Sequence, residues 1–440
     1  AGNYTLANAT ASTTANITPA TIAAITGITA ANKVYDATTA ATLTTTAAGF
    51  TGKVTGDNLT VATSTGTFSD KNVANGKTVN ITGLTLGGTD AGNYTLASNT
   101  ASTTANITPA QLTAITGITA ANKVYDTTTA ATLTTGGAGF TGKLGSDVLT
   151  VATATGNFSD KNAGNGKTVN ITGLSLGGAD AGNYLLPTGA TTTTANITQA
   201  NIAAVTGITA ANKVYDTTTA ATLTTTGAAF TGKITGDVLT LGAAPTGNFS
   251  DKNVANGKTV NITGLSLGGA DAGNYTLASS TATTTANITP ATISAITGIT
   301  AANKVYDGTN AATLATGGAG FTGRLGADVL TVATSTGAFS DKNVANGKTV
   351  NITGLTLGGA DAGNYTLANA TASTTANITP ATIAAITGIT AANKVYDATT
   401  AATLTTTAAG FTGKVTGDNL TVATSTGTFS DKNVANGKTV

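Results

Sequence analysis

The chain has 440 residues, and its 20 Lys and Arg against 19 Asp give a formal net charge of +1. It contains no Cys, His, Met, Trp or Glu, and its single arginine is Arg324. These absences exclude zinc fingers, thiolate nucleophiles, disulfide frameworks and imidazole bases. The balanced charge argues against nucleic acid, because phosphate binding needs a basic face. Thr makes up about a quarter of the chain and charged residues only 9%, which indicates a polar β protein.

Aromatic residues recur at a fixed spacing. The segments ANKVYD and AGNY each return every 90 or 91 residues, and two phenylalanine positions follow the same period. All ten Tyr and all ten Phe therefore belong to the repeat, and none is left for a singular site. The four sets are Tyr35, Tyr125, Tyr215, Tyr306 and Tyr396; Tyr4, Tyr94, Tyr184, Tyr275 and Tyr365; Phe50, Phe140, Phe230, Phe321 and Phe411; and Phe68, Phe158, Phe249, Phe339 and Phe429.

A longer period overlies this one, since residues 1–79 are identical to residues 362–440. The repeat phase predicts complete β repeats at 20–109, 110–199, 200–290 and 291–380. Residues 1–19 would be the C-terminal part of a truncated repeat, and residues 381–440 the N-terminal part of another. Because both ends cut through repeats, we expect a longer polypeptide. No stretch of 18 or more apolar residues occurs, so no membrane span is expected.

The elements of one repeat can be predicted in chain order from residues 20–109. The Ala-rich start should be extended, because Thr recurs every few positions and Glu is absent. Gly56-Asp57 suggests a hairpin between FTGKV and LTVAT, and Asn75-Gly76 a second between FSDKNVA and KTVNITGL. Leu59/Val61 and Val79/Ile81 alternate as in half-buried strands. The segments YTLAS and TTANIT should be the last two strands.

The segment from Asp90 to Tyr94 reads D-x-G-x-Y, and it recurs at matched positions. In immunoglobulin-like sandwiches a tyrosine so placed forms a corner, with its hydroxyl bonded to upstream backbone. The alternative is an ordinary core tyrosine after a Gly-rich loop. Residues 20–109 hold 15 Val, Ile and Leu, enough for one small two-layer core. We therefore predict an all-β tandem array of small immunoglobulin-like β-sandwich domains of about 90 residues, joined end to end.

Each repeat runs through the same ordered set of motifs: KVYD, which Gly308 follows in one copy, then GF-TG, FSDKNVANGKTV, NITGLTLGGADAGNYTL and ANITPA, with small variations. With these motifs the repeat resembles the YDG-type domains of bacterial surface exoproteins, which often occur in filamentous-haemagglutinin-like, two-partner-secreted adhesins. The resemblance implies an extracellular stalk or fibre at the surface of a Gram-negative bacterium, and it carries over no catalytic residues. The sequence departs from the pattern where Ala37 or Thr127 follows the Asp, at Gln199 in place of Pro, and at Pro187.

Calcium binding, a Lys–Asn cross-link and glycosylation each have a simpler alternative in this sequence. Calcium would need clustered oxygens, but Asp36, Asp57, Asp70 and Asp90 are dispersed, so we expect solvated turn acids unless they cluster at a domain junction. A cross-link between Lys33 and Asn106, assisted by Asp36, competes with an ordinary solvated lysine.

Glycosylation sequons occur at Asn16, Asn80, Asn93 and Asn106, and they could arise by chance in a Thr-rich chain. We therefore expect no catalytic, cofactor-binding or metal-binding residues. An enzyme is not expected, because any site built from Lys, Asp and Thr would recur in every copy.

These observations favour a structural repeat region, a stalk or filament of a long extracellular bacterial surface adhesin that serves attachment or biofilm formation. The alternative is an array of carbohydrate- or protein-binding modules. Expected partners are neighbouring repeats of the same chain and other copies in a fibre. Host, cell or abiotic surfaces would be contacted through regions outside this chain. Neither nucleic acid nor a membrane span is expected.

Three structural expectations follow. Both Phe and both Tyr should be mostly buried in every copy, and the extra residue near Pro245 should be absorbed as a loop or bulge. Proline in ANITPATI fixes φ, so the last strand of one repeat should run almost directly into the first of the next. This predicts a semi-rigid rod, with the junction at Gln199 differing most.

Overall fold

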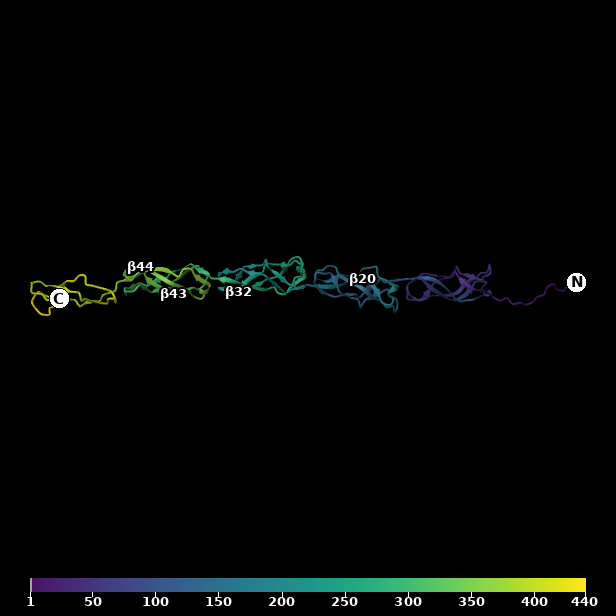
Figure 1. The fold of residues 1–440 in the computed structure, drawn as a ribbon, viewed down its shortest axis with the longest axis horizontal. Coiled ribbons are helices and arrows are strands. Elements are labelled where there is room, and N and C mark those ends of the chain that lie inside the picture. Colours follow the sequence, from purple (N-terminus) through teal and green to yellow (C-terminus); the bar gives the residue numbers. More distant parts are fainter. Residues whose placement is uncertain (1) are drawn as a thin grey trace. The chain divides into compact units, whose positions relative to one another are not determined.

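The computed structural model describes residues 2–440 (Figure 1). The chain falls into two compact units. The first runs to Ile202 and adds Gly232–Leu239 and Gly268–Leu277, and the second holds Ala203–Thr231, Thr240–Leu267 and Ala278–Val440. The division passes inside the third complete repeat. The junctions from the first to the second and from the second to the third repeat lie in the first unit, and the junction from the third to the fourth repeat lies in the second unit.

The first complete repeat consists of three longer strands, several strands of two or three residues and one 3-10 turn. The Ala-rich start is extended, as predicted, because its Thr and Ile residues favour strands. The elements are β1 (Ala20–Ile22), β2 (Ala24–Thr26), β3 (Thr29–Ala30), β4 (Lys33–Val34), β5 (Ala40–Ala41), β6 (Leu43–Thr44), β7 (Gly49–Thr51), β8 (Thr60–Phe68), β9 (Ala74–Gly87), η1 (Ala91–Asn93), β10 (Tyr94–Leu96) and β11 (Ala101–Thr108).

The main sheet has five strands in the order β4-β11-β9-β8-β5. Strand β11 pairs antiparallel with β9 and parallel with β4, so the first and last parts of the repeat meet in one sheet. Three two-stranded ladders accompany it: β1 with β10 in parallel, and β2 with β7 and β3 with β6 antiparallel. The same pairing recurs in the later repeats, as Figure 1 shows for β43 (Thr331–Phe339) beside β44 (Ala345–Gly358).

The core lies between the main sheet and the short ladders. Ile22, Ile25 and Ile28, from the ladder side, pack in one cluster with Ile81 and Leu84 of β9. The alternation of β9 is that of a half-buried strand, since Val79 and Ile81 are buried while Thr78 and Asn80 are exposed. The fold-class prediction is thereby confirmed: the chain is all-β and is built from sandwich repeats of about 90 residues.

The second repeat has the same element order in the first unit. Its elements are β12 (Ala110–Gln111), β13 (Ala114–Thr116), β14 (Thr119–Ala120), β15 (Lys123–Val124), β16 (Ala130–Ala131), β17 (Leu133–Thr134), β18 (Gly139–Thr141), β19 (Thr150–Phe158), β20 (Gly164–Gly177), η2 (Ala181–Asn183), β21 (Tyr184–Leu185) and β22 (Thr191–Thr198).

The third repeat is divided between the two units. Its elements are β23 (Ala200–Ile202), β24 (Ala204–Thr206), β25 (Thr209–Ala210), β26 (Lys213–Val214), β27 (Ala220–Ala221), β28 (Leu223–Thr224), β29 (Ala229–Thr231), β30 (Thr240–Leu241), β31 (Thr246–Phe249), β32 (Ala255–Thr263), β33 (Leu267–Gly268), η3 (Ala272–Asn274), β34 (Tyr275–Leu277) and β35 (Ala282–Thr289). The expected irregularity near Pro245 is present, because residues 242–245 separate β30 from β31.

The fourth repeat and the following partial repeat lie in the second unit. Besides β43 and β44 they contain β36 (Ala291–Ile293), β37 (Ala295–Thr297), β38 (Thr300–Ala301), β39 (Lys304–Val305), β40 (Ala311–Ala312), β41 (Leu314–Ala315), β42 (Gly320–Thr322), η4 (Ala362–Asn364), β45 (Tyr365–Leu367), β46 (Ala372–Thr379), β47 (Ala385–Thr387), β48 (Thr390–Ala391), β49 (Ala401–Ala402), β50 (Leu404–Thr405), β51 (Gly410–Thr412) and β52 (Gly427–Thr428).

Both predicted hairpins are wrong. Gly56-Asp57 forms a turn, but the strands that flank it pair elsewhere, β7 with β2 and β8 with β9. Asn75-Gly76 does not connect two strands. It lies inside β9, where two residues oppose the single residue Asn106 of β11, so the glycine with its φ of 61° serves a β-bulge. The loop of the β8–β9 hairpin is formed instead by residues 69–73.

The prediction that both phenylalanines are mostly buried holds, but one position is buried more fully than the other, and Phe429 in the partial repeat is only partly buried. Phe68, Phe158, Phe249 and Phe339 are at most 3% exposed. Phe50 and its counterparts are only half-buried. The reason is their position on β7, which pairs with β2 alone and so leaves one side of the ring without a covering strand.

Candidate functional site at the junctions between repeats

The connection between the first two repeats is a single residue. Strand β11 ends at Thr108 and β12 begins at Ala110, with Pro109 between them. The apolar core also continues through this point, since Leu112 and Tyr184 of the second repeat pack in one cluster with Tyr35 and Phe68 of the first. The second and third repeats are likewise separated by one residue, Gln199. The strand therefore passes from repeat to repeat without a spacer, as the proline-containing segment predicts.

Two tyrosines from successive repeats converge on one buried carboxylate at this junction. The hydroxyl of Tyr35, which follows β4, donates to Asp147 Oδ2 at 2.7 Å. Tyr184, the first residue of β21, donates to the same oxygen at 2.7 Å. Their ring centroids lie 5.4 Å apart in an edge-to-face arrangement that the aromatic quadrupole favours. Asp147, only 3% exposed, thus joins the KVYD motif of one repeat to the AGNY motif of the next.

A lysine of the first repeat supplies the positive charge that the buried carboxylate needs. Lys71 Nζ lies 2.6 Å from Asp147 Oδ1 and 3.3 Å from Asp180 Oδ1. It also lies 5.8 Å from the centroid of the Tyr35 ring. An unpaired carboxylate would be costly to bury, whereas this one is paired and hydrogen-bonded. Lys71, in the SDKN loop of the first repeat, therefore neutralises the turn of the second repeat that contains Asp147, which we call the acidic turn.

Beside this network an asparagine makes a second set of hydrogen bonds across the junction, which we call the asparagine bracket. Asn183, in η2 of the second repeat, accepts a hydrogen bond from the backbone N–H of Val73 at 2.9 Å. Its side-chain amide donates to Asn72 Oδ1 at 3.1 Å. The side chain is buried. The Asn183 carboxamide thus provides hydrogen-bond partners for the Val73 backbone and the Asn72 side chain of the preceding repeat.

The predicted tyrosine corner is also present. The Tyr184 hydroxyl accepts a hydrogen bond from the backbone N–H of Leu144 at 2.9 Å, as Tyr94 does from Val54 at 3.0 Å. The same hydroxyl donates to Asp147. The Tyr184 hydroxyl is therefore bonded to the backbone of its own repeat and to the Asp147 carboxylate. That carboxylate also accepts a hydrogen bond from Tyr35 of the previous repeat.

The network fixes the protonation states of its members. Burial alone would raise the pKa of Asp147, but hydrogen bonds from Lys71, Tyr184 and Tyr35 outweigh it and hold the pKa below its ordinary value. Burial and the hydrogen bond to Asp147 raise the pKa of Tyr184 to about 12. The hydrogen bond to Asp147 also raises the pKa of Lys71. At neutral pH the carboxylate is therefore charged and the phenol is protonated.

The same arrangement recurs at the next two junctions. In the first unit, Tyr125 and Tyr275 donate to Asp237 at 3.2 and 2.6 Å, and Lys161 lies 3.8 Å from that carboxylate. In the second unit, Tyr215 and Tyr365 donate to Asp328 at 2.8 and 2.7 Å, with Lys252 at 3.4 Å. The asparagine bracket is repeated by Asn274 and Asn364.

Asp57 shows the same turn without a preceding repeat. It accepts a hydrogen bond from Tyr94 and is half-buried, whereas Asp147 is buried. Residues 2–19 before it are exposed. At the other end of the described chain Tyr396 is 55% exposed, although Tyr35 at the matching position is 2% exposed. Burial of the KVYD tyrosine therefore depends on the following repeat, and the prediction that both tyrosines are buried in every copy is wrong for Tyr4 and Tyr396.

The other KVYD residues hold the loop that presents this tyrosine. Lys33 Nζ binds Asp36 Oδ1 at 2.7 Å and the carbonyl oxygens of Thr38 and Ala40 at 2.8 and 3.0 Å. The residue after the Asp has a left-handed backbone, with φ of 64° at Ala37, and Gly308 meets this requirement in the fourth repeat.

The expectation of solvated turn acids is thus correct for some carboxylates and wrong for others. Asp36 and Asp70 are exposed and pair with lysines. Asp147, Asp237 and Asp328 are buried, because the preceding repeat covers the turn. Acidic residues do meet at the junction, where an ammonium group lies between them. Among residues 2–440 no group of three or more carboxylates is placed to hold a metal ion.

Lys33 and Asn106 lie on paired strands, but the polar side-chain atoms proposed for the cross-link have other partners. Lys33 Nζ is bound within its own loop. Asn106 Oδ1 accepts the backbone N–H of Gly76 at 2.7 Å. Of the sequon positions, Asn16, Asn80 and Asn93 are exposed and Asn106 is half-buried. The counterparts of Asn93 at Asn274 and Asn364 are buried at junctions, where a glycan would have no room.

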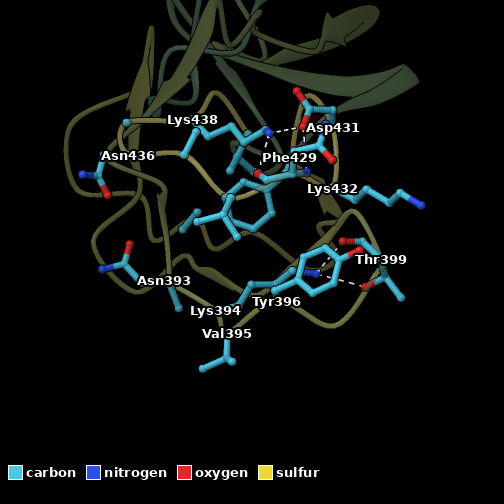
Figure 2. A pocket seen from close by; sticks show the side chains of 17 residues that line it. Asn393, Lys394, Val395, Tyr396, Thr399, Phe429, Asp431, Lys432, Asn436 and Lys438 are labelled. Atoms are coloured by element: carbon cyan, nitrogen blue, oxygen red, sulfur yellow. Dashed lines mark hydrogen bonds and ion pairs between the residues drawn. The ribbon is translucent and has the colours of Figure 1, made fainter.

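A cleft of 520 Å³ opens in the partial repeat, with Lys394, Tyr396, Phe429 and Lys438 along its wall (Figure 2). In a complete repeat, β11 crosses the matching region and pairs with both β4 and β9. Residues 381–440 contain no counterpart of β11. The cleft therefore lies at the position that β11 occupies in a complete repeat.

Comparison with known proteins identifies a domain family that recurs along the chain. A family model, the YDG domain, matches residues 18–102, 108–195, 198–285, 289–375 and 379–440. No curated protein matches the chain. None of the helical segments within residues 2–440 has the length and apolar character needed to cross a membrane.

Two solved structures are similar at low identity. Surface layer protein SbsC, domains 4–9, is 15% identical, with 86% of this chain and 66% of that chain covered and a TM-score of 0.16. The N-terminal eight Ig domains of Down Syndrome Cell Adhesion Molecule isoform 1.30.30 are 9% identical, with 87% and 58% covered and a TM-score of 0.14. This chain spans less than two thirds of either structure, and at these TM-scores neither likeness carries an argument.

Proposed function

Because the chain belongs to the YDG-domain family, we propose that it is a structural repeat region, a stalk or filament of a long extracellular bacterial surface adhesin or fibre. The supporting observation is the junction. Each of the first three complete repeats offers a tyrosine and a lysine to a buried carboxylate of the next, and at the first junction the apolar core is continuous across the contact. The tyrosine, lysine and aspartate side chains, which could otherwise form a binding site, hold successive repeats together.

The joined repeats would act as a semi-rigid rod that holds an adhesive region away from the cell and serves attachment or biofilm formation. One residue between consecutive strands leaves little freedom for bending, and proline restricts it further. The proposal gives the repeats no catalytic activity and places them outside the cell. The alternative, an array of binding modules, is not favoured, because the Phe68-type rings lie in the core and form no exposed stripe.

Small-angle X-ray scattering tests the rod. Removing residues 110–199 deletes one repeat and keeps a junction of the same residue types. A strand of nine residues at about 3.3 Å per residue is about 30 Å long, so the maximum dimension should shorten by at least that amount. A maximum dimension that does not change with the number of repeats would contradict the proposal.

A glycan array separates the two functions. The chain should bind no glycan, and deletion of one repeat should make no difference. Binding that weakens as repeats are removed would favour the alternative and would leave the scattering result unaffected.

A further inference from the structure

Every repeat contains one Asn-Gly pair shortly after FSDKN, and in the four complete repeats the pair lies in a strand. The five pairs are Asn75-Gly76, Asn165-Gly166, Asn256-Gly257, Asn346-Gly347 and Asn436-Gly437, and all ten residues are exposed. The glycines of the four complete repeats have φ between 60° and 62°. A Cβ added at Gly76 would meet no atom within 4 Å. The glycine is therefore required by the backbone and not by packing.

An Asn-Gly pair can react with itself. The glycine backbone nitrogen attacks Cγ of the asparagine and gives up its proton to water or hydroxide. The bond from Cγ to the side-chain nitrogen breaks, ammonia leaves, and a five-membered succinimide forms. Water then opens either carbonyl to give aspartate or isoaspartate. Glycine favours the attack because it has no Cβ to hinder it, and the reaction needs only water.

The four complete repeats restrain the attacking nitrogen in the same way. Gly76 N–H donates to the side-chain oxygen of Asn106 at 2.7 Å, across the bulge where the strand ladder is interrupted. Asn196, Asn287 and Asn377 accept the matching N–H groups at 2.7 Å. The Asn106 backbone is held in turn, since its N–H donates to Asn32 Oδ1 at 2.7 Å. The N–H that must be lost is thus already bonded.

We propose that Asn75 and its counterparts are deamidation sites, and that the side chain of Asn106 and its counterparts suppresses the reaction in complete repeats. The fifth pair is the built-in comparison. Residues 2–440 include no counterpart of Asn106 for this pair, and no asparagine among them accepts a hydrogen bond from Gly437. Deamidation would add a negative charge, and isoaspartate would lengthen the backbone inside the bulge, so an exposed, long-lived fibre would benefit from this restraint.

Site-resolved mass spectrometry of the full chain after incubation in mildly alkaline buffer tests the proposal. Asn436 should deamidate first. Asn75, Asn165, Asn256 and Asn346 should react at least about fivefold more slowly, as expected for the loss of one good hydrogen bond. Equal rates at all five positions would overturn the proposal.

Two variants isolate the role of Asn106. Asn106→Ala should raise the rate at Asn75 about fivefold or more, while Asn165 in the same molecule stays slow. Asn106→Asp keeps an acceptor for the Gly76 N–H and should keep Asn75 slow. Ile81→Val is the control for general loosening of this repeat and should change the rate little. An unchanged rate in Asn106→Ala, or an equal acceleration by Ile81→Val, would contradict the restraint.

Discussion

At Asp147 a turn that could be solvated becomes part of the core, because the preceding repeat brings a phenol and an ammonium group to it. Asp57 occupies the matching position in its repeat and has the same tyrosine corner, yet it remains half-buried. The difference comes from the neighbouring repeat and not from the turn itself. The pair therefore provides a matched comparison within one molecule.

Asp147→Asn should destabilise the junction by about 2–3 kcal/mol, because it removes the nearer of the two carboxylates that pair with Lys71 and weakens two hydrogen bonds. The loss should stay below that for a fully buried pair, since the Lys71 side chain is 36% exposed. Asp57→Asn, which affects no preceding repeat, should cost less. Chemical denaturation followed by circular dichroism measures both. Equal losses at the two positions would show that the junction adds nothing to the turn.

The pH dependence of stability follows from the same groups. The pKa of Asp147 in the folded chain is below its ordinary value of 3.8, so its stabilisation is present above about pH 4 and is lost as pH falls through the folded pKa. The pKa of Tyr184 is raised from 10.0 to about 12, so its stabilisation is present below pH 10 and is lost as pH rises toward 12. The chain has no His or Cys to titrate in between.

The thermal unfolding midpoint should accordingly be flat from about pH 5 to about pH 9 and should fall on either side. A scan of the midpoint against pH measures this. A sharp change between about pH 5 and about pH 8 would contradict it. Chelators should leave the midpoint unchanged.

The residue after the KVYD aspartate carries backbone strain in three of the four complete repeats. Thr127 and Thr217 have φ of 70° and 69°, a region that β-branched residues avoid. Thr127→Gly and Thr217→Gly should each stabilise the chain by about 0.5–1 kcal/mol. Gly308→Thr should destabilise it, because an added Cβ would lie 2.8 Å from Val415 Cγ1 of the next repeat. Urea midpoints measure all three, and a loss of stability in either glycine variant would refute the argument.

At the scale of elements, the residue pattern predicted strands better than their partners. Val79 and Ile81 alternate because β9 buries one face, and this is visible in the sequence. Asn75-Gly76 suggests a turn equally well, but its positive φ serves a bulge opposite Asn106, 30 residues away. Local sequence shows that a glycine is required, and only the tertiary pairing of β9 with β11 shows why.

The interrupted strand of the third repeat allows a direct test. In the first repeat β8 is continuous, and Thr63 lies opposite Thr85 with their hydroxyls 2.6 Å apart. Replacing residues 241–245 by the shorter Val-Ala-Thr-Ser of the first repeat should join β30 to β31. Hydrogen exchange of the backbone amides in this stretch should then slow to the rate of the β8 amides. Persistent fast exchange would mean that the break has a cause beyond the extra residue near Pro245.

At the scale of the whole molecule, the repeat period and the all-β class could be predicted from the aromatic spacing. The junction could not, because Lys71 and Asp147 are 76 residues apart and belong to different repeats. A signal was nevertheless present. The aspartate recurs at Asp57, Asp147, Asp237, Asp328 and Asp418, although the residue before it is Gly, Ser or Ala. An acid that is kept while its neighbour varies indicates a contact that every copy makes.

The account depends on the junctions being stiff, and distances across one junction test this most directly. The chain has no cysteine, so spin labels can be attached specifically at cysteines that replace the exposed residues Thr42 and Thr132. Pulsed electron spin resonance should give one narrow distance distribution. Adding Lys71→Ala and Asp147→Ala should broaden it. A distribution that is already broad in the otherwise unchanged chain, and that the two substitutions do not alter, would contradict a locked junction and with it the stalk.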